Sequence, residues 1–317
     1  MNKKINVFCI IAIVSLLIVT ACDDGNDGNV VAGVTWTAIT DSTFGTHIRN
    51  ITWGNDKFVA GGERGYMAYS ADGITWTAID IFKTENQLDV SGIAFGNNKF
   101  VAGGAGIVRM AYSTDGTIWT IVPGGAARRI IWNGGKFLKA GFLGTMAYSV
   151  DGITWTNLAN NFTNFNIAGI AWGNNKFIAV TENSEIAHST DGITWTTVDH
   201  NLFGWVSFRD IAFGNGKFIA STVNGLLLYS ADGINWTTVA DSTFGRSGIN
   251  AIAWGNDKFV AGGASGKMAY SIDGITWTAV EDSTFGTSWI TSIVWGGGKF
   301  VAVGHNGKIA YWDGVLR

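Results

Sequence analysis

The sequence predicts an all-β fold, a seven-bladed β-propeller with four antiparallel strands in each blade. The dipeptide Lys-Phe recurs seven times, at intervals of 37 to 42 residues, beginning at residues 57, 99, 136, 176, 217, 258 and 299. A second motif, Ser-x-Asp-Gly, begins at residues 70, 113, 149, 189, 230 and 271. Each period also holds short apolar runs separated by glycine-containing turns. This combination is typical of radially repeated four-stranded sheets.

Residues 1–21 are predicted to be a signal peptide. Lys3 and Lys4 form a positive segment, and the apolar stretch 5–19 that follows is short for a membrane span. Residues 19–22 (VTAC) resemble the lipobox of bacterial lipoprotein signals. That resemblance implies cleavage before Cys22 and lipid attachment to its sulfur and its new amine. The alternatives are an ordinary secretory signal and a retained N-terminal membrane anchor.

Residues 22–29 are predicted to be the lipidated cysteine and a flexible tether, because residues 23–29 (DDGNDGN) are polar and contain glycine. Cys9 is lost with the signal, so Cys22 remains as the single cysteine and no disulfide forms within the mature chain. Two or three acyl chains anchor a protein stably. We therefore expect the membrane as a partner through a lipid anchor, and a location in the bacterial cell envelope, facing the periplasm or the surface.

Residues 30–317 are predicted to form the propeller as one domain. In the repeat around Trp254, strands are expected at 249–255, 258–263, 267–271 and 275–280. The turns between them are Gly-Asn-Asp-Lys, Ser-Gly and Asp-Gly, and Asp-Gly between apolar runs is a strong hairpin signal.

The seventh repeat is split between the two ends of the domain. Its third strand stands at the C-terminus, around Tyr311-Trp312-Asp313-Gly314, whereas its fourth stands at 33–39. We expect the N-terminal strand to pair with the C-terminal blade, which closes the ring and leaves no free edge between the first and last blades.

The longer motif Ser-x-Asp-Gly-x-Thr-Trp resembles the Asp-box of bacterial neuraminidase-repeat propellers, which are found in sialidases and in photosystem-assembly-factor-like proteins. Each copy here has one residue fewer between Asp and Gly. The resemblance implies a structural turn between the third and fourth strands. A calcium site is not expected, because each motif offers one carboxylate where calcium takes six to eight oxygens. The aspartates predicted to be structural are Asp72, Asp115, Asp151, Asp191, Asp232 and Asp273.

Any ligand is expected on the rim opposite these motifs, where the turns and connections differ from blade to blade. Arg49, Arg128 and Arg209 stand four residues before the aromatic anchor of the innermost strand in blades one, three and five. The other blades have Ser91, Ala168, Asn250 and Thr291 at this position. Three converging guanidinium groups would bind a carboxylate or phosphate. The alternative is that these arginines are solvated or paired with neighbours such as Asp210.

Aromatic residues in the inter-blade connections form a second group of candidates. Trp205 and Trp289 lie outside the repeat pattern, so each either packs against the fold or stacks on a ligand. The recurring phenylalanines are instead expected to cap the seams between blades, and they are Phe44, Phe82, Phe162, Phe203, Phe244 and Phe285. The polar turn at Glu63 is expected to be a solvated loop tip.

These patterns favour a binding or scaffolding propeller with an envelope protein, an acidic glycan or a peptide as its ligand. The alternative is a glycan-active, sialidase-like hydrolase that uses the arginine cluster, but no residues match that family's Tyr/Glu pair, so no catalytic residue is assigned. We expect no metal and no cofactor, since the four histidines have no ligand spacing. Nucleic acid is excluded as a partner, because the chain has 21 basic and 24 acidic residues and no basic run.

Overall fold

The computed structural model describes residues 33–82, 89–104, 109–159, 162, 165–198 and 204–317. The predicted signal peptide, Cys22 and the tether lie outside these residues. Residues from Val34 to Arg317 form one compact unit. Across the described ranges, no helix is long and apolar enough to cross a membrane.

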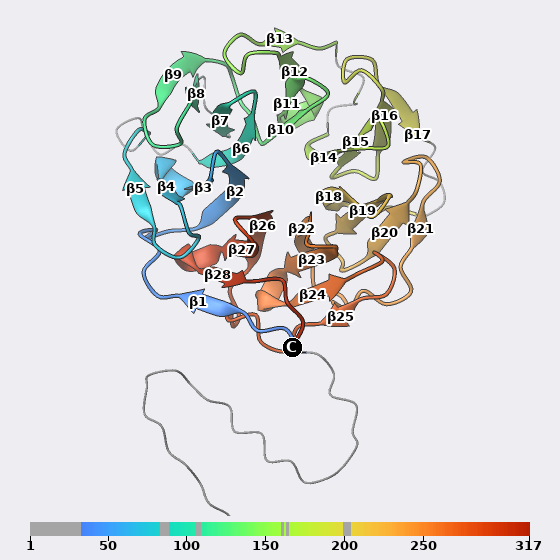
Figure 1. Cartoon of the computed structure of the whole chain (residues 1–317). Coiled ribbons are helices and arrows are strands. Elements are labelled where there is room, and N and C mark those ends of the chain that lie inside the picture. Colours follow the sequence, from blue (N-terminus) through green and yellow to red (C-terminus); the bar gives the residue numbers. More distant parts are fainter. Residues whose placement is uncertain (1–32, 83–88, 105–108, 160–161, 163–164, 199–203) are drawn as a thin grey trace, which may run out of the picture. The chain divides into compact units, whose positions relative to one another are not determined.

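The predicted fold is confirmed, with seven four-stranded antiparallel sheets arranged in a ring (Figure 1). The innermost strands are β2 (Ile48–Gly54), β6 (Val90–Gly96), β10 (Arg129–Asn133), β14 (Ile167–Gly173), β18 (Phe208–Gly214), β22 (Ile249–Gly255) and β26 (Ile290–Gly296). The second strands are β3 (Lys57–Gly62), β7 (Lys99–Gly104), β11 (Lys136–Ala140), β15 (Lys176–Thr181), β19 (Lys217–Thr222), β23 (Lys258–Gly263) and β27 (Lys299–Gly304).

The third and fourth strands complete each blade. The third strands are β4 (Met67–Ser70), β8 (Arg109–Ser113), β12 (Met146–Ser149), β16 (Ile186–Ser189), β20 (Leu227–Ser230), β24 (Met268–Ser271) and β28 (Ile309–Trp312). The outer strands are β5 (Thr77–Ile79), β9 (Thr120–Pro123), β13 (Thr156–Asn157), β17 (Thr196–Val198), β21 (Thr237–Thr238), β25 (Thr278–Ala279) and β1 (Thr37–Ile39). Single 3-10 turns follow the second strand in four blades, namely η1 (Glu63–Gly65), η2 (Phe142–Gly144), η3 (Ala264–Gly266) and η4 (His305–Gly307).

The ring closes as the split repeat predicts. Strand β1 pairs antiparallel with β28, with Thr37 opposite Tyr311 and Ile39 opposite Ile309. Trp36, just before β1, is buried, and its ring centroid lies 6.1 Å from that of Trp312. The first and last segments of the domain therefore share one sheet and one core cluster.

Neighbouring blades interlock next to the central channel through an aromatic side chain set against a glycine. A Cβ atom added to Gly54 would lie 2.0 Å from the ring of Phe95 in the next blade, and one added to Gly296 would lie 2.1 Å from Trp53. The aromatic ring thus takes the space that a side chain would need. The same contact joins Gly96 to Trp132, Gly173 to Phe213, Gly214 to Trp254 and Gly255 to Trp295.

The Ser-x-Asp-Gly motifs form hydrogen-bonded turns. In the motif of blade four, Asp191 Oδ1 accepts the backbone N–H groups of Ile193 and Thr194 at 2.8 Å, and Ser189 Oγ accepts the N–H of Gly192 at 2.8 Å. The other five copies repeat these bonds. The six aspartates act within their own turns, as the structural interpretation requires.

The outer strands are shorter than predicted. The sequence predicts a strand over 275–280, whereas β25 covers only Thr278–Ala279. The reason is that Asp273 draws the N–H groups of Ile275 and Thr276 into the turn, which leaves them unable to join the sheet ladder.

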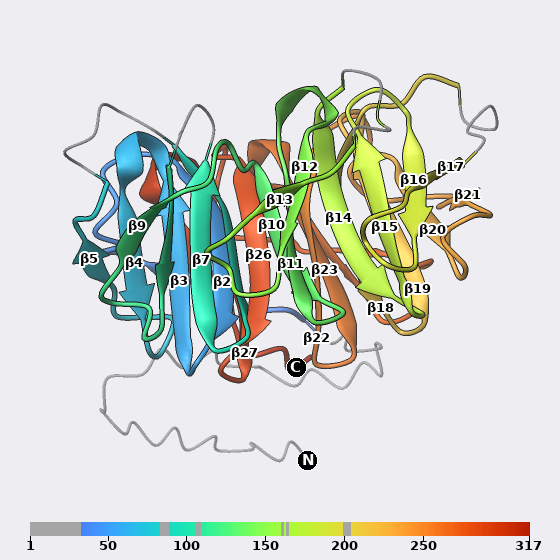
Figure 2. The ribbon, with the colours of Figure 1, turned by 90° about the horizontal axis from the view of Figure 1, so that it is seen from above.

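The ring has two different rims. The turn rim consists of the turns after the innermost strands, such as 54–57, and the Ser-x-Asp-Gly turns. Bonds between these turns join adjacent blades, such as Asn55 Nδ2 to the carbonyl of Thr114 at 3.2 Å and Lys136 Nζ to that of Asp191 at 2.7 Å. The loop rim consists of the turns after the second strands and the connections between blades. Figure 2 shows the ring from the side, with the C-terminus on the turn rim.

The loop phenylalanines fill the seams between blades, as predicted. Phe162 is buried in one cluster with Ala179 of β15 and with Trp195, whose ring centroid is 5.8 Å away. The equivalent residues Phe44, Phe82, Phe244 and Phe285 are also buried, and Phe203 lies outside the described residues.

Stability is expected to fall as the pH drops from about 4 toward 2, because the motif aspartates must then be protonated. Hydrogen bonds from the N–H groups of Ile193 and Thr194 lower the pKa of Asp191 to about 2. At the other motif aspartates burial opposes the same kind of bonds, which outweigh it and also lower the pKa. Since these folded-state pKa values lie below the unfolded one, their stabilisation is complete above the unfolded pKa and is lost on acidification. Melting temperatures measured across this range test this. An Asp191→Asn variant should show a shallower loss, and an identical acid profile would contradict the assignment.

Candidate functional site

In six of the seven blades a β-bulge sets one residue of the innermost strand at the loop-rim mouth of the channel. Blade three has no register shift, and Arg128 stands there just before β10. In blade one the register between β2 and β3 shifts between Ile48 and Asn50, so Arg49 is the extra residue. Arg209 is the extra residue of β18 in the same way. Bulges re-aim a side chain out of the regular alternation. The residues that the sequence aligned four positions before the aromatic anchor therefore occupy this bulge position or its equivalent.

These positions, except Ala168 of blade four, surround one cavity of about 510 Å³, here called the channel-mouth cavity. Every blade contributes to its lining, and blades five and six contribute only their bulge residues, Arg209 and Asn250. The lining is Arg49, Asp89, Ser91, Arg128, Arg129, Phe142, Asn166, Glu182, Arg209, Asn250, Trp289, Thr291 and His305. The structure thus brings the three predicted arginines together around a common volume, with four guanidinium groups and two carboxylates in the wall.

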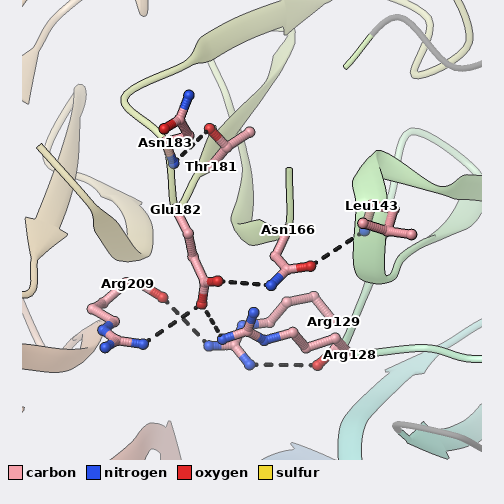
Figure 3. Close-up of polar contacts among 8 residues, drawn as sticks. All are labelled: Arg128, Arg129, Leu143, Asn166, Thr181, Glu182, Asn183 and Arg209. Atoms are coloured by element: carbon pink, nitrogen blue, oxygen red, sulfur yellow. Dashed lines mark hydrogen bonds and ion pairs between the residues drawn. The ribbon is translucent and has the colours of Figure 1, made fainter. Parts of the chain in front are cut away.

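Glu182 of blade four links two of the predicted arginines (Figure 3). Its Oε1 lies 2.6 Å from Arg128 Nη2 and 3.6 Å from Arg209 Nη1, so it bridges blades three and five. Asn166 Nδ2 donates to its other oxygen at 2.8 Å. Burial alone raises the pKa of Glu182, but these hydrogen bonds and the charges of Arg128 and Arg209 outweigh it and lower that pKa. Glu182 is therefore held as a carboxylate.

Arg49 is paired on the other side of the cavity. Its Nη2 donates to Glu63, and its Nε lies 3.6 Å from Asp89 Oδ2. Glu63 also accepts a bond from Thr46 Oγ1 at 2.8 Å. The turn at Glu63, expected to be a solvated tip, is instead a partner of Arg49.

Arg129 also lines the cavity, and Asp210 interacts with it from outside the lining. Arg129 donates to the carbonyl oxygens of Arg128 and Arg209, both at 3.4 Å. Burial lowers the pKa of Arg129, and the charge of Asp210 opposes that change. Burial raises the pKa of Asp210, whose Oδ2 accepts the N–H of Ile252 at 2.9 Å. Asp210 therefore interacts with Arg129 and accepts a hydrogen bond from the backbone of blade six.

A stack of aromatic rings borders the cavity where the first and last blades meet. The rings of His47 and His305 stack with centroids 4.1 Å apart, and Trp289 stacks on His305 at 5.4 Å. The N–H of Asn306 donates to His47 Nδ1 at 2.9 Å, so that nitrogen is an acceptor. Burial, together with the charges of His47 and Arg49, lowers the pKa of His305.

The two predicted tryptophans have different positions. Trp289 lines the channel-mouth cavity and remains 46% exposed. Trp205 does not line it; this side chain is 72% exposed, and its indole N–H donates to Asn183 Oδ1 at 3.1 Å.

Sequence reasoning missed Glu182, Arg129 and His305 as cavity residues. A signal was present for two of them. Glu63, Glu182 and His305 all stand directly after the second strand, and each backbone N–H bonds to the connection before the innermost strand of its own blade. Aligning the residues that directly follow each second strand would have identified these three neighbours of the arginine cluster.

Besides the arginines, the titratable side chains in the described lining of the cavity are Asp89, Glu182 and His305. No tyrosine is among the described lining residues, and Glu182 is kept ionised. No group of three or more His, Cys, Asp or Glu side chains among the described residues is placed to hold a metal ion.

No protein-family model and no curated protein matches the sequence. Solved structures do match. A structure described as "YCF48 bound to D1 peptide" is similar with a TM-score of 0.72 and 17% identity, over 90% of this chain and 96% of that one. YCF48 from Cyanidioschyzon merolae gives 0.71 and 18%, over 87% and 98%. Virginiamycin B lyase from Staphylococcus aureus gives 0.75 and 11%, over 88% and 98%. At such identities the similarity shows the β-propeller fold.

Glu182→Gln is expected to lower the free energy of unfolding by about 1–3 kcal/mol, because it leaves two guanidinium groups without their shared carboxylate. The exposed residue Glu281 provides a matched control, since Glu281→Gln removes the same charge away from the cavity. Chemical denaturation of both variants tests this. Equal stabilities would show that the bridge between blades three and five contributes nothing measurable.

Proposed function

We propose that this chain is a membrane-tethered binding propeller of the bacterial cell envelope, and that its ligand presents a carboxylate to the channel-mouth cavity. An acidic peptide end or a carboxylated sugar fits this description. The observation that carries the proposal is the convergence of Arg49, Arg128 and Arg209 on one cavity, where Arg128 and Arg209 share the single carboxylate of Glu182. A bound carboxylate would supply a second counter-charge for that pair.

The spacing around Glu182 leaves room for such a ligand. Arg128 is within hydrogen-bond distance of Glu182, whereas Arg209 at 3.6 Å is attracted without a direct bond. Arg209 therefore retains donors for an incoming carboxylate while Arg128 keeps its partner. The partly exposed ring of Trp289, which also lines the cavity, offers an apolar surface for the remainder of the ligand.

The comparisons support a binding role by analogy of fold. One similar propeller is described as bound to a peptide. Another is a lyase, so the fold also carries catalysis in other proteins. The hydrolase alternative has less support in this chain, because no tyrosine lines the cavity and Glu182 is held as an arginine-bound anion.

Arg209→Gln is expected to weaken carboxylate binding roughly 10-fold or more, the effect of losing one charge-assisted hydrogen bond. Suitable probes are short acidic peptides with a free C-terminus, compared with their amides, and glucuronate compared with glucose. Binding to the mature domain, measured by calorimetry at low and high salt, should favour the acids and weaken as salt rises. Arg246→Gln removes the same charge from an exposed loop outside the cavity and should change nothing. Equal affinity for acids and neutral analogues would refute the site.

The tether is tested separately from the site. Cys22→Ala should move the protein from the membrane fraction to the soluble or secreted fraction, because no other residue matches the lipobox cysteine. Fractionation of cells that express each form is the measurement. Retention of the variant with membranes at the wild-type level would contradict lipid anchoring and leave the binding site unaffected.

A further inference from the structure

Blade three departs from the repeat at one buried position. In six blades the third residue after the recurring lysine is an alanine of the second strand with no exposed surface: Ala60, Ala102, Ala179, Ala220, Ala261 and Ala302. In blade three this residue is Lys139, and it is only 6% exposed. A position that accepts alanine six times does not need a charge to build the fold.

The seam between blades two and three, which Lys139 lines, also lacks a loop phenylalanine. The connection from blade two to blade three, residues 124–128 (GGAAR), contains no aromatic residue. In the next seam Phe162 covers Trp195, the tryptophan of the blade-four motif. In the seam between blades two and three, Lys139 Nζ lies 5.1 Å from the ring centroid of the equivalent Trp155. The lysine therefore stands over the tryptophan where other seams place a phenyl ring.

The lysine does not fill the seam. A cavity of about 760 Å³ remains, here called the seam cavity, with walls from β9 and the connection after it and from β12 and its motif turn. Apolar surface comes from Val122, Met146 and Trp155, among others. Thr145 and Asn157 add polar side chains, and no acidic residue is among the described residues that line it. This volume is within the range typical of small-molecule sites.

Lys139 has no carboxylate partner within the described part of the chain. Its Nζ donates to the carbonyl oxygen of Gly124 and lies 3.8 Å from Met110 Sδ. Burial lowers the pKa of Lys139 to about 8, and no neighbouring charge contributes to that change. An ammonium group has three donors, so one remains after the bonds to Gly124 and to Met110 Sδ. A buried charge is costly unless it is paired, which makes this position favourable for an anion.

We propose that the seam cavity is a second ligand site, one that binds a small organic monocarboxylate with an apolar body. The carboxylate pairs with the ammonium group of Lys139, and the apolar body lies on Trp155 and Met146. One cation matches one negative charge. The site is separate from the channel-mouth cavity, and the two share no lining residue.

A purely structural role for Lys139 predicts different behaviour. If the lysine served only to replace the missing phenylalanine over Trp155, removing its charge would destabilise the protein and leave carboxylates unbound. If it is a ligand site, Lys139→Met keeps the apolar stem, removes an unpaired buried charge, and should melt at the same temperature as the ligand-free wild type or higher.

The experiment compares three acids, phenylacetate, 4-phenylbutyrate and hexanoate, with their amides. Binding is followed by the indole ¹⁵N–¹H resonance of Trp155 in the mature domain and quantified by calorimetry. We expect wild type to prefer at least one acid over its amide by about 10-fold or more, as for loss of a charge-assisted hydrogen bond. Lys139→Met should bind acid and amide equally weakly.

Two further variants keep the result decisive. Lys139→Ala introduces the residue that the other six blades carry, so a folding defect in Lys139→Met would not end the test. Arg209→Gln alters the channel-mouth cavity alone and should leave the Trp155 response unchanged, which separates this site from the proposed function. The proposal is overturned if none of the three acids shifts the Trp155 resonance, or if acid binding survives in both Lys139 variants.

Discussion

The close approach of each innermost strand to the aromatic ring of the next blade is the contact on which the rest of this structure depends. Gly54 and Gly296 lack the Cβ that would collide with Phe95 and Trp53, so the ring system of one blade rests directly on the backbone of its neighbour. Glycine in a strand interior is unfavourable in itself and is explained by such an approach. Blade three is the exception, with Asn133 at this position. Repeated around the ring, the contact keeps the innermost strands near one axis.

That arrangement explains how a repeated scaffold produces the channel-mouth cavity. Six blades offer a bulge position at the channel mouth, Arg128 stands at the equivalent place in blade three, and the ring directs most of these positions toward one volume. A serine or alanine at this position adds no charge at the channel mouth, whereas an arginine adds one positive charge. The cluster is tolerated because acids from neighbouring elements stand between the guanidinium groups, above all Glu182, which lies between Arg128 and Arg209. Like charges are held together by shared counter-charges.

Several departures from the repeat lie in blade three or in the connection that precedes it. It follows the shortest interval in the chain, 37 residues between successive Lys-Phe pairs, and the connection that precedes it lacks the seam phenylalanine. Lys139 replaces a buried alanine, and the space between blades two and three is left partly open. In a repeat protein the common positions report on folding, so a blade that breaks several of them at once is where a separate function is most easily accommodated.

The sequence by itself determined the fold, because the repeat period, the turn residues and the split seventh unit are local patterns that only a closed ring of four-stranded blades satisfies. It also aligned Arg49, Arg128 and Arg209 in one column. It overestimated the outer strands, since the hydrogen bonds of the Asp273 turn compete with the sheet ladder. Only the tertiary structure decided which acids meet those arginines, that Trp289 lines the cavity while Trp205 does not, and that Lys139 is buried without a carboxylate partner among the described residues. Those outcomes depend on distances between blades, and the repeat pattern of a single blade contains no information about what its neighbours place opposite it.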